Sequence, residues 1–275
     1  MIEGVRKIDS GEWSVYFIDQ LSDALKIEIR HHLSTICFGS INANSGRIAY
    51  SYKATAREFV KRYIAQDGDG NRQKGMVGEL LFHVLMSIEN EYIATSAFFN
   101  LEERSFKKGF DLSFFSVENQ ELWIAEVKSG EKKKSQSNQT QAIVSLINTA
   151  KSDLKKRLNS DNNTLWLNAI NHARLAVNET IDEKKIILNL LGDYSDQAEA
   201  GIYTSEDKNV MLVGVLFHPI CEEADPQKIQ GKHEKTRKAA IFSKIRTVAI
   251  QKETYEAVFR FLDDNPRLFG TNYSG

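Results

Sequence analysis

The sequence predicts an α/β fold in which a mixed central sheet is flanked by helices. Three stretches carry this prediction. Residues 73–88 place apolar side chains at helical spacing, residues 110–117 and 121–128 are strand-like runs around a polar break, and residues 209–217 are almost continuously apolar. Such an unbroken run suits a strand buried on both faces. A helix, a hairpin, a further helix at 138–158 and a late buried strand together indicate a layered α/β unit.

The helix predicted over residues 73–88 is apolar nearly all round, which is typical of a buried helix. Glu79 therefore places a carboxylate on a largely apolar surface. Burying a charge is costly unless the charge is paired or binds a metal ion. Two preceding glycines, Gly75 and Gly78, would permit close approach of another element. Glu79 is thus a candidate functional residue.

The predicted hairpin brings two further charged residues together. If the turn is formed by residues 118 and 119, Val117 faces Gln120 and Asp111 faces Glu126. Facing residues of an antiparallel pair project to the same side of the sheet, with Cβ atoms roughly 5 Å apart. Lys128 lies two residues beyond Glu126 and projects to that side as well. A turn with one residue more would break this arrangement.

The helix glutamate, the strand aspartate and the Glu126-Val127-Lys128 motif resemble the PD-(D/E)xK nuclease superfamily, which has the restriction-endonuclease-like fold. Two details narrow the resemblance. Gly-x-x-Gly-Glu at 75–79 and Gly-Phe-Asp at 109–111 are similar to the HamA-like nuclease branch of Hachiman anti-phage defence and its relatives in AbpA-type systems. The motifs cover about a fifth of the chain.

This resemblance implies a restriction-endonuclease-like core and a nuclease that cleaves DNA with Mg²⁺ or Mn²⁺. Asp111 and Glu126 would supply carboxylate ligands, which Mg²⁺ accepts readily, and the Val127 carbonyl would be a third ligand. Lys128 would orient or deprotonate the attacking water and offset charge on the phosphate. Glu79 would hold a metal-bound water or a second ion. Gln139, after the motif strand, would border the site.

Two functions remain open at this stage. The first is a DNase that acts as a defence effector under the control of a separately encoded HamB-type helicase, a partner implied by the resemblance alone. The second is a nuclease-like fold that no longer cleaves and serves as a DNA-binding or partner-binding module. In that case Asp111, Glu126 and Lys128 would form an ordinary cross-strand ion pair.

The motifs divide the chain into two parts. Residues 1–66 contain two helical patterns and no site chemistry, so we expect an N-terminal extension, a helical elaboration packed on the core. Residues 67–275 form the expected nuclease-like domain, and one globular unit overall is the simplest arrangement. The loop signal at 67–71 departs from a calcium-binding loop at its sixth and twelfth positions and is interpreted as a plain linker. Residues 193–207 are polar and are expected to form a loop.

The formal net charge of −1 gives no global attraction to nucleic acid, so any DNA-binding surface must be local. Basic residues cluster after the motif strand and again over residues 227–246. We expect both clusters to line the approach to the site, through Lys132, Lys133 and Lys134 and through Lys235, Arg237 and Lys238. The alternatives are a charged loop or a surface that grips an acidic partner.

Nothing in the sequence indicates secretion or a membrane. The two cysteines, Cys37 and Cys221, stand far apart, which fits a reducing compartment. The first residues lack the apolar core of a signal peptide, and no apolar run is long enough to span a bilayer. We therefore expect a cytoplasmic protein without a membrane partner.

Overall fold

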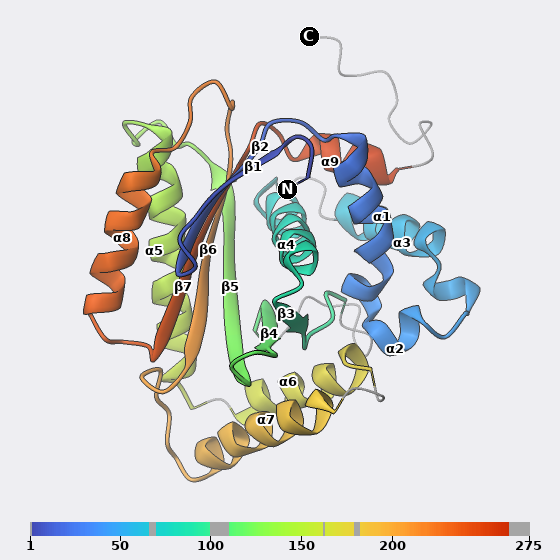
Figure 1. The fold of residues 1–275 in the computed structure, drawn as a ribbon, viewed down its shortest axis with the longest axis vertical. Helices are drawn as coiled ribbons and strands as arrows, with labels where there is room; N and C mark the ends of the chain where they lie inside the picture. The colour runs from blue at the N-terminus through green and yellow to red at the C-terminus, as the bar shows by residue number, and fades with distance from the viewer. Residues whose placement is uncertain (1, 66–69, 100–109, 162, 179–181, 264–275) are drawn as a thin grey trace.

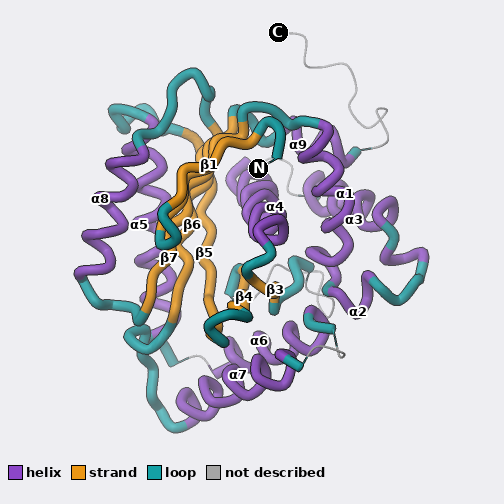
Figure 2. The backbone as a smooth tube through the Cα atoms, in the orientation of Figure 1, coloured by secondary structure: helices purple, strands orange, loops and turns teal. Residues whose placement is uncertain are grey.

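The computed structural model describes residues 2–65, 70–99, 110–161, 163–178 and 182–263. These residues form a seven-stranded sheet with helices on both of its faces (Figures 1 and 2). The strand order is β1-β2-β7-β6-β5-β4-β3. The strands are β1 (Val5–Asp9), β2 (Trp13–Ile18), β3 (Tyr92–Ala94), β4 (Leu112–Ser116), β5 (Glu121–Glu131), β6 (Asn209–Phe217) and β7 (Lys244–Lys252).

The sheet is mixed, as the sequence predicts. Its four central strands, β2, β7, β6 and β5, run parallel to one another. Strand β1 adds antiparallel to β2 at one side, and β4 and β3 add antiparallel beyond β5 at the other. Strand β6 is buried along almost its whole length, which explains the unbroken apolar run at 209–217.

Each face of the sheet has its own core. On one face α4 (Gly70–Glu89) lies against β5, with α1 (Asp23–Phe38) and α3 (Tyr52–Ile64) outside it (Figure 1). On the other face lie α5 (Gln139–Leu158) and α8 (Pro226–Lys238). Helices α6 (Asn163–Ala176) and α7 (Glu183–Glu199) complete this second core, and the short α2 (Ser40–Ala43), η1 (Ile48–Tyr50) and α9 (Glu256–Leu262) extend the first side.

Helix α4 is the central helix of the first core, and the prediction of a buried helix is confirmed. Ten of its residues from Met76 to Met86 are buried, and only Glu79 in that stretch is half-exposed. Gly78 lets the helix touch the sheet: a Cβ atom there would lie 1.9 Å from Oγ and 2.9 Å from Cβ of Ser129 in β5. Gly75 has no such role, because its Cβ would meet nothing within 4 Å among the described atoms.

Helix α5, which covers the candidate site, begins where its sequence provides a cap. The side chain of Asn138 accepts a hydrogen bond of 2.9 Å from the backbone N–H of Gln141, which satisfies one of the free donors of the first turn. The apolar side of the helix then packs on β5 and β6. A Cβ atom on Gly130 would lie 3.4 Å from Leu146, whereas Arg157 contacts Glu126, so the helix runs antiparallel to β5.

Three expectations need correction or extension. Helix α7 continues to Glu199, so residues 193–199 are helical rather than a loop. The basic stretch at 227–246 is α8 followed by the start of β7, not a charged loop. The first 66 residues also do more than pack helices on the core, because β1 and β2 are strands of the same sheet. The boundary at 66–67 and most of the 67–71 segment lie outside the described residues.

No helix in the described ranges is both long enough and apolar enough to cross a membrane.

Candidate functional site

The β4–β5 hairpin has the register that the sequence predicts. Leu112 pairs with Ala125 and Ser116 with Glu121, so Asp111, which directly precedes β4, continues this register opposite Glu126. The turn is longer than expected. It comprises the four residues 117–120, because the last paired residues are Ser116 and Glu121. A turn of four residues and a turn of two residues differ by an even number. The side chains of both strands therefore project to the same faces as predicted.

Asp111 stands where the ladder between β4 and β5 ends. Its Oδ2 accepts a hydrogen bond of 3.0 Å from the backbone N–H of Val127, in place of a strand partner. The N–H and C=O of one strand residue project to the same side. The Val127 carbonyl is therefore directed to the same side of β5 as the N–H that Asp111 accepts.

Glu126 lies at the centre of the cluster and is fully buried on the α5 side of the sheet. Arg157, from the last turn of α5, contacts both oxygens of this carboxylate. Nη2 of Arg157 donates to Oε1 at 3.1 Å, and Nη1 lies 3.0 Å from Oε2 and 4.0 Å from Oδ1 of Asp111. The guanidinium thus contacts one carboxylate closely and lies near the other.

Burial and the adjacent charge of Asp111 raise the pKa of Glu126 to about 7, against the opposing attraction of Arg157 and Lys128. The carboxyl is therefore only partly ionised near neutral pH. Within the described part of the chain, Oε2 of Glu126 receives no well-directed hydrogen bond, although Nη1 of Arg157 lies 3.0 Å away as an ion pair. This buried carboxylate oxygen is therefore already occupied by a cation.

Lys128 is held from two sides. Its Nζ lies 2.9 Å from Oε1 of Glu126 and 2.9 Å from Oδ2 of Asp153, which is one helical turn before Arg157 on α5. Burial alone would lower the pKa of Lys128, but the attraction of Glu126 and the hydrogen bond to Asp153 outweigh it and raise that pKa. The ammonium is therefore charged in this state. It can donate hydrogen bonds and offset negative charge, but it cannot accept a proton.

The oxygen atoms of the cluster fit a Mg²⁺ or Mn²⁺ ion. Two carboxylates and one carbonyl are the ligand types that Mg²⁺ prefers, with water and substrate oxygens completing its shell. A positively charged guanidinium already lies against both carboxylates, which shows that this position favours a cation. Across the described ranges, no group of three or more His, Cys, Asp or Glu side chains gathers as a metal site, here or elsewhere, so an ion at this position would depend on two carboxylates, a backbone carbonyl and water.

Two predicted site residues lie apart from this cluster. Glu79 is half-buried rather than buried, and it belongs to α4 on the opposite face of the sheet, one residue after the contact of Gly78 with Ser129. Gln139 starts α5, whereas Arg157 is near its end. Eighteen residues at 1.5 Å each separate them by about 27 Å along the helix, and the Gln139 side chain donates to the backbone carbonyl of Glu223.

The two basic clusters lie at opposite ends of the sheet, so they do not form one approach. Lys132 to Lys134 follow the carboxyl end of β5, which is level with the ends of β6 and β7. Lys235, Arg237 and Lys238 occupy the last turn of α8, close to the start of β7. Whether either cluster binds DNA stays a prediction.

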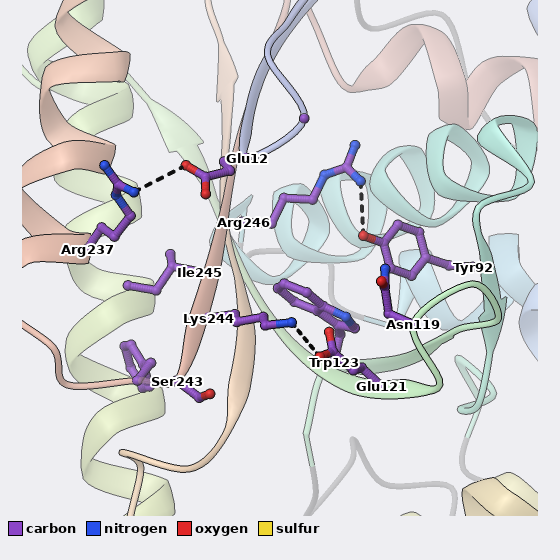
Figure 3. A pocket seen from close by; sticks show the side chains of 12 residues that line it. Glu12, Tyr92, Asn119, Glu121, Trp123, Arg237, Ser243, Lys244, Ile245 and Arg246 are labelled. Atoms are coloured by element: carbon purple, nitrogen blue, oxygen red, sulfur yellow. Dashed lines mark hydrogen bonds and ion pairs between the residues drawn. The ribbon is translucent and has the colours of Figure 1, made fainter.

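A pocket of about 390 Å³ lies at this second end, where β5 and β7 begin (Figure 3). Arg237 at its rim lies 3.9 Å from Glu12, and Lys244 pairs with Glu121. Trp123, which also lines the pocket, belongs to the core on the α4 side, whereas Glu126 faces α5. The pocket is therefore separate from the Asp111–Glu126 cluster, and its charges are already engaged within the chain.

Asp153 and Arg157 are the site residues that the sequence did not reveal. They contact the motif through the docking of α5 on β5, across 25 and 31 residues of chain. One signal was present: two ionisable residues four apart, on the helix that follows the Glu-x-Lys strand, share one helix face. Their charges are opposite to those of the two motif residues that they contact.

The HamA family model matches residues 6–262 of the chain, which include every strand from β2 to β7 and all of the cluster described above. No curated protein matches the chain.

Proposed function

Because this chain belongs to the HamA family and is thereby associated with anti-phage defence, we propose that it is a metal-dependent nuclease that cleaves DNA phosphodiester bonds. The observation that supports this proposal is the convergence of Asp111, Glu126 and Lys128 on one side of the β4–β5 hairpin. Metal-dependent cleavage of a phosphodiester uses oxygen ligands to hold the ion and a positive charge near the phosphate.

Each residue would have a distinct task. Asp111, Glu126 and the Val127 carbonyl would hold a Mg²⁺ ion, which supplies charge neutralisation and an activated water when it is bound. Lys128 is charged, so its part would be to orient that water and to stabilise negative charge on the phosphate, rather than to remove a proton. Glu79 lies on the opposite face of the sheet, so we give it no part in holding this ion.

The decisive experiment is a test of metal dependence. Purified protein is incubated with supercoiled plasmid DNA in Mg²⁺, in Mn²⁺ and in excess EDTA, and nicked and linear products are quantified. We expect cleavage in either metal, none in EDTA, and recovery when Mg²⁺ is added back. Glu126→Gln, which keeps the side-chain shape but weakens a ligand, serves as the control for contaminating nucleases. Equal cleavage by this variant would contradict the proposal.

A defence nuclease must be restrained in its host, so we propose a controlling partner, of the HamB helicase type that the family resemblance implies. The same plasmid assay, run with and without such a partner, measures the restraint directly.

A second function is favoured by one observation. Arg157 and Lys128 already neutralise the two carboxylates, which is also how a structural ion cluster without metal would look. The protein would then be a module that binds DNA or a partner without cleaving. Intact plasmid under every metal condition, together with measurable DNA binding, would support this second function.

The basic end of α8 gives a further prediction about DNA binding. Lys235→Ala, Arg237→Ala and Lys238→Ala together should weaken DNA binding at low salt and flatten its salt dependence. Each lost phosphate contact lowers the slope of log affinity against log salt by about 0.9 on duplex DNA. Arg237 already pairs with Glu234, so we expect a reduction of about two contacts rather than three. Folding should be preserved, because exposed charges contribute little to stability.

The triple alanine variant of Lys132, Lys133 and Lys134, at the other end of the sheet, tests the second predicted DNA-binding cluster in the same way. Binding is measured by fluorescence anisotropy across a salt series, and complex formation with a partner is measured in parallel. An unchanged salt slope in the α8 variant, with loss of the complex, would show that α8 grips an acidic protein surface instead.

A further inference from the structure

We propose that Arg157 is the resident cation of the candidate metal site, and that a metal ion binds there by displacing its guanidinium from Glu126. This inference rests on the proposed function, because it concerns the same carboxylates. It adds a regulatory element to them, namely the last turn of α5.

The contacts place Arg157 where a metal ion would compete with it. The guanidinium lies 3.0 and 3.1 Å from the two oxygens of Glu126, and 4.0 Å from the nearer oxygen of Asp111. These are the two side chains that the proposed function assigns to the ion. A Mg²⁺ ion bound to a carboxylate requires oxygen ligands at about 2.0–2.1 Å, so an ion at these oxygens would compete with the guanidinium for their lone pairs and for the space between the two carboxylates.

The charges of the cluster lead to the same conclusion. Asp111, Glu126 and Asp153 carry three negative charges, and Lys128 and Arg157 carry two positive ones, when all are ionised. With all five of these groups ionised, the sum is one negative charge without metal. A divalent ion would make it positive by one, whereas a divalent ion that replaces Arg157 makes it neutral. Excess charge in a largely buried cluster is unfavourable.

Arg157 is the cation better placed to leave. Lys128 projects from the middle of β5 and is held by two carboxylates, Glu126 and Asp153, each at 2.9 Å. The Lys128 and Arg157 side chains are equally exposed, at 26%, but Arg157 lies in the last turn of α5, which ends at Leu158. Helix ends fray more readily than strand centres, so its side chain can swing outward while Asp153 keeps Lys128 in place.

The test is metal binding, measured by isothermal titration of Mn²⁺ into the full chain. Breaking charge-assisted hydrogen bonds accounts for an affinity change of about tenfold to a hundredfold. We therefore expect Arg157→Gln to bind Mn²⁺ that much more tightly than the wild type. Lys156→Gln removes the same charge from the neighbouring exposed position and should leave affinity unchanged. Arg157→Lys keeps the charge but loses the two-pronged contact. Its Mn²⁺ affinity should lie between those of the wild type and Arg157→Gln.

A thermal unfolding series keeps the test valid if Arg157→Gln is unstable. Without metal, the variant should unfold at a lower temperature than the wild type, because a buried carboxylate has lost its partner. Addition of Mn²⁺ should then raise the unfolding temperature more in the variant than in the wild type. An equal rise, or equal affinity in the titration, would overturn the inference.

The outcomes separate this inference from the function on which it rests. If wild type and Arg157→Gln bind Mn²⁺ with the expected difference but leave DNA intact, the inference stands and the nuclease proposal fails. If both cleave DNA and bind Mn²⁺ equally well, the nuclease proposal stands and Arg157 has no competing role. Glu126→Gln should abolish tight binding. Retained tight binding in that variant would place the ion elsewhere and also refute the inference.

Discussion

Replacing Lys128 with alanine is expected to lower the rate of Mg²⁺-dependent DNA cleavage by about 10²- to 10³-fold, the usual contribution of one positioned group that stabilises developing charge. Its ammonium is fixed by Glu126 and Asp153, each at 2.9 Å, so it is already aligned before substrate arrives. The loss should appear in the rate at saturating DNA, because the interaction strengthens as charge develops on the phosphate.

Lys244→Ala is the matched control. Lys244 is also a strand lysine in an ion pair, with Glu121, but it lies at the start of β7. Cleavage rates are measured from single-turnover time courses, and circular dichroism verifies that both variants are folded. A Lys128→Ala protein that cleaves at the rate of Lys244→Ala would remove Lys128 from the mechanism and favour the binding-module function.

The largest effect on stability is expected at Gly78. In Gly78→Ala the added Cβ would lie 1.9 Å from Oγ and 2.9 Å from Cβ of Ser129, and 3.3 Å from Cβ of Val215. The hydroxyl can rotate away, but the Cβ of a central strand residue cannot, so α4 must shift from the sheet. Overpacking of this kind costs about 1–3 kcal/mol, more than the 0.5–1 kcal/mol gained by alanine in a helix.

Gly75→Ala provides the comparison within the same helix. Its Cβ would meet nothing within 4 Å among the described atoms, so only the helix-propensity gain remains and the protein should be more stable by about 0.5–1 kcal/mol. The free energy of unfolding is measured in urea for both variants. Two variants of equal stability would mean that α4 does not depend on close contact with β5 at Gly78.

The sequence predicted the arrangement of the hairpin because that arrangement depends on parity alone. Side chains of a strand alternate with a period of two, so turns of two and four residues give Asp111 and Glu126 the same face. The buried character of α4 and β6 followed in the same way from local apolar patterns. These properties depend only on the residues within one short segment, so the local sequence is sufficient to predict them.

The parts that the sequence could not predict depend on how distant elements dock. Arg157 reaches Glu126 only because α5 lies on β5 with a particular rotation and slide, which its apolar stripe alone does not define. The half-exposure of Glu79 likewise depends on which neighbours cover α4. Nor does the pattern of residues 1–66 reveal that β2 pairs with β7, since that pairing joins residues as far apart as Trp13 and Thr247.

This last pairing has a consequence for synthesis on the ribosome. Strand β7 is the last of the described strands to be made, yet it lies between β2 and β6, and β2 reaches the rest of the sheet only through it. The first hairpin, β1–β2, therefore has no β7 partner until about 250 residues have been translated. Folding that depends on such distant contacts is slow, and chains interrupted before β7 would expose two strand edges that invite aggregation.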